Sequence, residues 1–211
     1  MPSTKQPHLR DLLENKMPHF AIVGIDLAGV PHRPTGVCVL RKGYAQTMLT
    51  YPDDEILSIV SREKPDLVTI DAPLSLPPGR RSIHQRNGEH FRPCDLELRR
   101  RKIPFFPITL GPMRSLTERG ISLKGRIEKR GFQALEIYPG GAQDIWGIPR
   151  VKHDMKGLRE GLCRLGIKEL REDSSGHELD AATAALVGCL YLQGKGEIFG
   201  QLSSGAIIMP R

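Results

Sequence analysis

Acidic residues stand at the ends of two apolar segments of this sequence. The segment 20–25, Phe-Ala-Ile-Val-Gly-Ile, is followed by Asp26, and the segment 66–70, Asp-Leu-Val-Thr-Ile, is followed by Asp71. Near-continuous runs of β-branched residues are typical of central strands covered on both faces. A carboxylate at the end of such a strand needs a hydrogen-bond donor, a cation or a metal ion. The two segments therefore predict buried strands that present acids.

Two further acids accompany apolar segments. Glu136 lies within the segment 132–138, and Asp180 lies three residues after His177 near the start of the Ala- and Leu-rich segment 177–191. Residues three apart share one face of a helix. Magnesium prefers oxygen ligands, and hydrolysis of a phosphodiester by two metal ions about 3.5–4 Å apart needs several converging carboxylates. The predicted ligands of Mg²⁺ or Mn²⁺ are Asp26, Asp71, Glu136 and Asp180.

Each predicted site residue also has a purely structural explanation. Asp26 and Asp71 could accept hydrogen bonds from neighbouring loops. Glu136 could point to solvent, and Asp180 could stabilise the start of its helix through the helix dipole. His177, which we predict to orient water or substrate, could simply lie beside the helix N-cap.

The remaining pattern predicts a mixed α/β sheet flanked by helices. Segments 35–41 and 44–50, joined by a tight Lys-Gly turn, form a hairpin that extends the first strand into a three-stranded antiparallel meander. Asp53 or Asp54 is the expected N-cap of the first helix. The expected helices span about residues 53–62, 113–129, 152–165 and 177–191. These are the elements of a ribonuclease H-like α/β fold.

Charge is concentrated in one part of the chain. Between Ser75 and Gly131 there are fourteen Lys or Arg residues and five acids, so this segment carries +9 while the remainder carries −2. We treat 75–131 as a basic insertion within a single domain, residues 19–211, preceded by an N-terminal arm, residues 1–18. A surplus of this kind favours a polyanionic partner, DNA or RNA. The alternative is a solvated helical face.

Composition excludes several classes of protein. The sequence is 39% hydrophobic and 26% charged, which is ordinary for a globular protein. No apolar run approaches the ~20 residues that span a bilayer, and the polar N-terminus does not resemble a signal sequence. We therefore expect a cytoplasmic protein with no membrane partner. The four scattered cysteines indicate neither a zinc site nor a disulfide framework, and the oligomeric state stays open.

Five short motifs also resemble a known family. In chain order they are Gly24-Ile-Asp-Leu-Ala-Gly29, Ile70-Asp-Ala-Pro-Leu74, Arg92-Pro-Cys-Asp95, Glu136-Ile-Tyr-Pro139 and His177-Glu-Leu-Asp-Ala-Ala182. Their order is similar to that of a bacterial and archaeal family, domain of unknown function number 429, whose members are described as predicted nucleases of ribonuclease H-like fold. The resemblance covers about residues 20–192. The His-x-x-Asp spacing also resembles the last-helix motif of Holliday-junction resolvases.

Three functions remain open on this basis. The first is a metal-dependent nuclease whose basic insertion binds phosphates. The second is a non-catalytic nucleic-acid-binding module of the same fold. The third is a phosphotransferase, because the motif 24–29 also resembles the phosphate-binding strand turn of actin and the sugar kinases. Those proteins pair two such domains, whereas this chain has room for one. We further expect Asp95 to pair with Arg99, one helical turn away.

Overall fold

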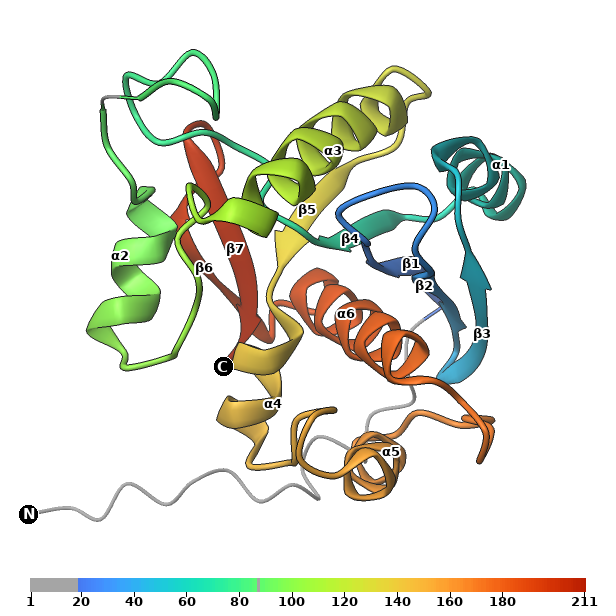
Figure 1. Ribbon diagram of the computed structural model, residues 1–211. Coiled ribbons are helices and arrows are strands. Elements are labelled where there is room, and N and C mark those ends of the chain that lie inside the picture. Colours follow the sequence, from blue (N-terminus) through green and yellow to red (C-terminus); the bar gives the residue numbers. More distant parts are fainter. Residues whose placement is uncertain (1–18, 87) are drawn as a thin grey trace, which may run out of the picture.

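A seven-stranded mixed sheet forms the centre of the protein (Figure 1). The computed structural model describes residues 19–86 and 88–211, so the expected N-terminal arm lies outside the described part of the chain. The strand order is β3-β2-β1-β4-β5-β7-β6. The strands are β1 (Ala21–Asp26), β2 (Thr35–Arg41), β3 (Tyr44–Thr50), β4 (Leu67–Asp71), β5 (Ala134–Ile137), β6 (Gly196–Gln201) and β7 (Gly205–Pro210).

The strand directions confirm the predicted ribonuclease H-like arrangement. β1, β2 and β3 form the antiparallel meander, and β4 and β5 continue the sheet parallel to β1. The turn between β2 and β3 places Lys42 and Gly43 at positive φ, 52° and 84°, as a two-residue hairpin turn requires. The acids at the ends of β1 and β4 consequently lie at the same edge of the sheet.

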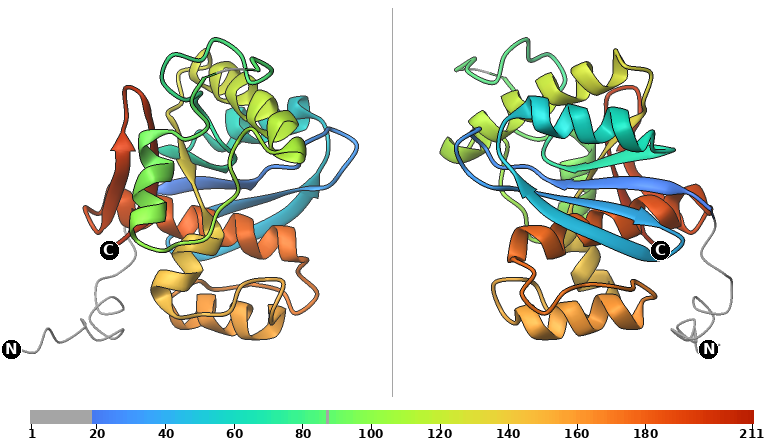
Figure 2. Two further views of the ribbon diagram at one scale, coloured as in Figure 1. Left: turned by 60° about the vertical axis from the view of Figure 1, so that its left-hand side comes forward. Right: turned by 90° about the vertical axis from the view of Figure 1, so that its right-hand side faces the viewer.

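Helices cover both faces of the sheet (Figure 2). On one face α1 and α3 enclose a core that includes Ile25, Ile70 and Leu123, and on the other face α6 lies along the sheet with α4 and α5. The helices are α1 (Asp53–Glu63), α2 (Pro93–Arg100), α3 (Gly111–Glu128), α4 (Pro139–Trp146), α5 (Met155–Arg164) and α6 (Gly176–Leu192). Both faces of the central strands are therefore covered and kept from water, as the near-continuous apolar segments predicted.

Two glycines let α6 approach the sheet closely. A Cβ on Gly24 would collide with the backbone of Ala181 and Ala185, and a Cβ on Gly36 would collide with the carbonyl of His177. The helix backbone therefore lies directly on β1 and β2. Because the helix begins beside the end of β1, its first turn faces the acidic edge of the sheet.

The structure contains elements that the sequence pattern did not predict. α2 packs through Cys94 and Leu98 against Phe199 and Met209 of the C-terminal hairpin β6–β7. The hairpin was missed because β6, Gly-Glu-Ile-Phe-Gly-Gln, does not alternate cleanly. α4 was missed because its first residues, Pro-Gly-Gly, were interpreted only as the end of β5.

Two local predictions were wrong. The N-cap of α1 is Pro52, and it makes no side-chain capping bond. Asp53 and Asp54 lie in the first turn, where they are ion-paired with arginines of α3. Asp95 binds Arg92, the N-cap of α2, in place of the expected Arg99.

Candidate active site

Asp26 and Asp71 are direct neighbours. They are the last residues of β1 and β4, and the parallel register pairs their Cα positions. Both side chains are partly exposed, in contrast to the fully buried residues that precede them in each strand. The predicted pair of acids is thus assembled by strand register alone.

The first turn of α6 faces this pair. The hydroxyl of Ser175 caps the helix by accepting a hydrogen bond from the amide of Glu178. The amide of Ser175 in turn donates to the side chain of Glu178. With the helix start held in this way, His177 Nδ1 lies 2.6 Å from Asp26 Oδ2. Asp180, one turn later, is partly buried beside the same acids. His177 is therefore more than a neighbour of the N-cap, because it binds a predicted site residue.

The acids influence one another electrostatically. Burial and, to a lesser degree, the charge of Asp26 together raise the pKa of Asp180 to about 7. The pKa of Asp71 is well above its usual value because of burial, followed by the charges of Asp26, Asp180 and Glu136. The hydrogen bond to Asp26 raises the pKa of His177. The edge thus holds excess negative charge that a cation would relieve.

Two polar residues of this edge were not identified from the sequence. Gln143 of α4 donates from Nε2 to Asp180 Oδ1 at 2.7 Å and to Thr183 Oγ1 at 3.1 Å. Arg150 pairs with Asp144, donates to the hydroxyl of Tyr138 at 3.0 Å, and lowers the pKa of Asp180 through its charge. Neither lies in a motif that carried a chemical signal: Gln143 belongs to α4, which was not predicted, and Arg150 lies between α4 and α5.

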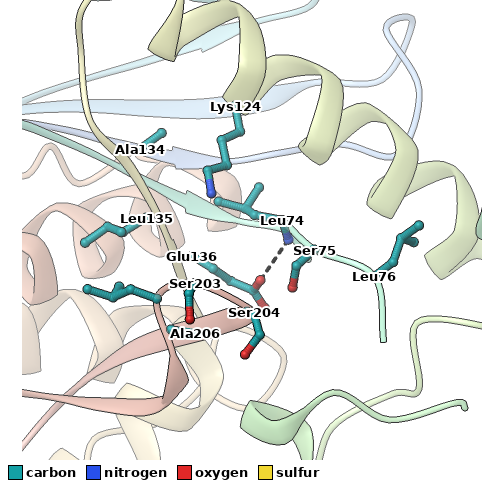
Figure 3. A pocket seen from close by; sticks show the side chains of 12 residues that line it. Leu74, Ser75, Leu76, Lys124, Ala134, Leu135, Glu136, Ser203, Ser204 and Ala206 are labelled. Carbon is teal, nitrogen blue, oxygen red and sulfur yellow. Dashed lines mark hydrogen bonds between the residues drawn. The ribbon is translucent and has the colours of Figure 1, made fainter. Parts of the chain in front are cut away.

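Glu136 lies close to Asp71 but has different partners. Arg92 donates to both of its oxygens, at 2.6 and 2.8 Å, and also to both oxygens of Asp95. The amide of Leu74 donates to Glu136 Oε2 at 2.8 Å, as Figure 3 shows. Glu136 is 5% exposed, so it does not point to solvent. Its carboxylate is bonded to a buried guanidinium that it shares with Asp95, and its role as a metal ligand stays a prediction.

Glu136 also separates two cavities. One, of about 260 Å³, lies between the segment after β4 and the β6–β7 turn, and Lys124 lines it together with Ser203 and Ser204 (Figure 3). The other, of about 200 Å³, lies on the side of Asp71 and Tyr138. The second cavity adjoins the predicted acids, whereas the first reaches only Glu136.

Part of the basic insertion lies against this edge. Arg119 of α3 donates to the carbonyl of Ala28 at 2.6 Å, and Gly120 allows α3 to contact the carbonyl of Pro73. Ala28 and Pro73 follow β1 and β4 directly, so α3 lies over the loops that leave the acids. Several cations of the insertion are used internally, in buried or ion-paired positions: Arg80, Arg92, Arg100, Arg101, Arg119 and Arg126.

The donors at this edge suit a hard cation only in part. Carboxylate and amide oxygens are the ligands that Mg²⁺ and Mn²⁺ prefer, and Asp26, Asp71, Asp180 and Gln143 supply them. Within residues 19–86 and 88–211, however, no three acid, histidine or cysteine side chains are gathered tightly enough to hold an ion as they stand. His177 occupies one oxygen of Asp26. Metal binding would therefore require side-chain movements.

A family model decides the membership of this chain. The model described as "Protein of unknown function (DUF429)" matches residues 24–201. The chain belongs to this family. The match includes all five motifs from which the resemblance was inferred, so that prediction is confirmed. The DUF429 description assigns no activity, and a comparison with curated proteins finds no match.

Solved structures similar to this DUF429 chain include two Holliday junction resolvases. The structure titled "T. thermophilus RuvC in complex with Holliday junction substrate" is 16% identical, with 83% of this chain and 97% of that chain covered and a TM-score of 0.42. The yeast mitochondrial Holliday junction resolvase Ydc2 is 14% identical, with 88% and 83% covered and a TM-score of 0.40. The strand order and directions, rather than these superpositions, define the fold.

None of the helices in the described part of the chain combines the length and apolar character needed to cross a bilayer. Cys38, Cys94 and Cys189 are buried, as expected of core thiols, and Cys163 is exposed.

Proposed function

We propose that this protein is a metal-dependent nuclease that hydrolyses phosphodiester bonds in DNA or RNA, with Asp26, Asp71 and Asp180 as ligands of Mg²⁺ or Mn²⁺. The observation that carries the proposal is the register of β1 and β4, which sets Asp26 beside Asp71 opposite the first turn of α6. When bound, a pair of such ions activates water and stabilises the leaving oxygen.

The protein's own residues have defined tasks in this proposal. His177 holds Asp26 through Nδ1, and its Nε2 has no partner among the described residues, so it is available to orient water or a phosphate oxygen. Gln143 fixes the orientation of Asp180. Arg92 and the amide of Leu74 hold Glu136, which anchors the chain that follows Asp71. The proposal does not require Glu136 as a ligand, because its oxygens are engaged.

The ligands are tested by metal binding and cleavage together. Calorimetry with Mn²⁺ and Mg²⁺ should show weak binding by the parent, since open sites completed by substrate keep several waters. Asp26→Asn and Asp71→Asn should abolish that binding. The same variants should lose cleavage of a mixed panel of DNA and RNA by more than about 100-fold, the upper end of what loss of a mere supporting group costs.

The matched control is Glu97→Gln, which removes a carboxylate from α2 on the surface, where it pairs with Arg100 and Arg101. It should leave both metal binding and cleavage unchanged. Unchanged cleavage by Asp26→Asn and Asp71→Asn would overturn the proposal. Salt-sensitive binding of nucleic acid with no cleavage under either metal would favour the non-catalytic module.

A further inference from the structure

The cavity beside Asp71 is small and mainly apolar. Its volume of about 200 Å³ lies below the range of about 300–1,000 Å³ that is typical of pockets for drug-sized ligands. Space of this size suits one flat ring system rather than a whole nucleotide. Apolar side chains from the segments after β4 and β5, from α3 and from the segment around Phe106 line most of it, and the charged side chains of Arg92, Asp95 and Glu136 line the rest together with Asp71.

Phe106 presents an aromatic ring to solvent at this cavity. Its side chain lines the cavity and is 69% exposed, the highest value among the exposed large hydrophobic residues of the described chain. The neighbouring Phe105, by contrast, packs edge-on against Phe91 with ring centroids 6.0 Å apart. An exposed aromatic ring that borders a concave, mainly apolar site is available for a flat ligand to stack on.

The segment that carries Phe106 is held in place from both sides. Ile103 and Ile108 are buried, and the hydroxyl of Tyr138 donates to the carbonyl of Pro104 at 2.7 Å. Pro104 and Pro107 restrict the backbone on either side of the ring. The backbone that carries the ring therefore loses little conformational entropy when a partner stacks on it.

Asp71 lies on the wall of the same cavity. On the proposed function, on which this inference rests, the phosphate that is cleaved sits at Asp71. The adjoining apolar space then lies within one nucleotide of that phosphate. Stacking of a base on an aromatic side chain is the common way in which proteins bind unpaired nucleotides, and it is tolerant of sequence.

We propose that the Phe106 cavity binds one unpaired nucleobase next to the scissile phosphate. A base held in a duplex stack cannot enter such a cavity without being extruded. The substrate class is therefore nucleic acid with an unpaired nucleotide at the point of cleavage, such as a single strand, a flap or a junction, and not a continuous duplex.

The test is equilibrium binding in EDTA, where no metal-dependent cleavage occurs. The probes are a single-stranded DNA and a single-stranded RNA, each carrying one fluorescent 2-aminopurine, and the same sequences as full duplexes. The parent should quench 2-aminopurine in the single strands and prefer them to the duplexes. Phe106→Ala should abolish the quenching and weaken single-strand binding by about 5- to 100-fold, the range expected for one stacked base.

Two further variants separate stacking from folding. Phe106→Tyr keeps the ring and should bind and quench as the parent does. Leu110→Ala removes another exposed apolar side chain, 48% exposed and outside the cavity, and should change nothing. Equal binding and quenching by Phe106→Ala and the parent, or equal affinity of the parent for single strands and duplexes, would overturn the inference.

Failure of this inference is distinguishable from failure of the proposed function. If Asp71→Asn loses cleavage while Phe106→Ala retains the parent's binding, only the base site fails. If Phe106→Ala loses quenching in EDTA but no metal supports cleavage by the parent, only the nuclease fails.

Discussion

Two groups of acids lie at the same edge of the sheet and differ in their burial and in their cationic partners. Asp95 and Glu136 are buried, and the guanidinium of Arg92 is bonded to all four of their oxygens. Asp26, Asp71 and Asp180 remain partly exposed, and among the described residues no Lys or Arg is ion-paired with them. The first group shares one buried guanidinium between its two carboxylates, whereas the second has no such partner and is the group that we propose to bind a cation.

The two groups of acids therefore contribute differently to the free energy of folding. A buried acid with a bonded cation holds elements together, here β5, α2 and the segment after β4. Acids that crowd one another without a cation cost folding free energy, which a protein retains where function requires it. The comparison predicts that substitutions in the two groups change stability in opposite directions.

The largest effect should follow from Arg92→Met. It leaves the carboxylates of Asp95 and Glu136 buried without their cation, and breaking a buried pair in this way costs about 3–5 kcal/mol. Urea unfolding measures the loss. Arg100→Met is the control, because Arg100 pairs with Glu97 on the surface, and its stability should match the parent. An equally stable Arg92→Met would remove the distinction between the two groups of acids.

Asp180→Asn should change the free energy of unfolding in the opposite direction, at pH 8 in EDTA. The pKa of Asp180 is raised from 3.8 to about 7, and each unit corresponds to about 1.4 kcal/mol. Removal of the charge should therefore stabilise the fold, by up to about 4 kcal/mol on this conversion. Asp71→Asn should also stabilise it. A strongly destabilised Asp180→Asn would assign Asp180 to the structural group.

The free energy of unfolding should also depend on pH because of these acids. The pKa of Asp180 is higher in the folded protein, so between about pH 4 and 7 the folded state binds more protons than the unfolded state. The free energy of unfolding in metal-free buffer should therefore fall as the pH rises through this window, and the raised pKa of His177 should extend the fall above about pH 6.5. Urea unfolding at several pH values measures the slope, which Asp180→Asn should reduce. A parent that gains stability as the pH rises through this window would contradict the prediction.

The smallest effect concerns cations that remain exposed. Arg114 and Arg130 each donate to a carbonyl of the local backbone, at opposite ends of α3, and Arg114 adjoins Met113 at the cavity beside Asp71. Arg114→Ala should reduce the salt dependence of nucleic-acid binding by about one phosphate contact, whereas Arg130→Ala should not. Titrations at several salt concentrations measure both. An equal change in salt dependence for both variants would mean that the nucleic acid does not pass closer to Arg114 than to Arg130.

The sequence alone determined the strands β1 to β5 and the acids that end β1 and β4. The apolar runs before Asp26 and Asp71, the hairpin signal at Lys42-Gly43 and the amphipathic or apolar helices are local patterns, and local patterns can be interpreted without knowledge of the fold. The family resemblance, confirmed by the match to residues 24–201, placed these elements in order. The position of His177 beside Asp26 follows from Gly24 and Gly36, whose small size the sequence shows but whose partner helix it does not.

Only the tertiary structure decided which acids have cations. Glu136 and Asp71 look alike in the sequence, since each accompanies an apolar strand. The partner of Glu136 is Arg92, 44 residues away, on an element that was not predicted, and α2 is held there by a C-terminal hairpin that was also missed. Ion pairing between distant segments depends on burial and geometry in three dimensions, which no local periodicity encodes. For the same reason, the cavity between Phe106 and Asp71 could be found only once α3 was seen to lie across the ends of β1 and β4.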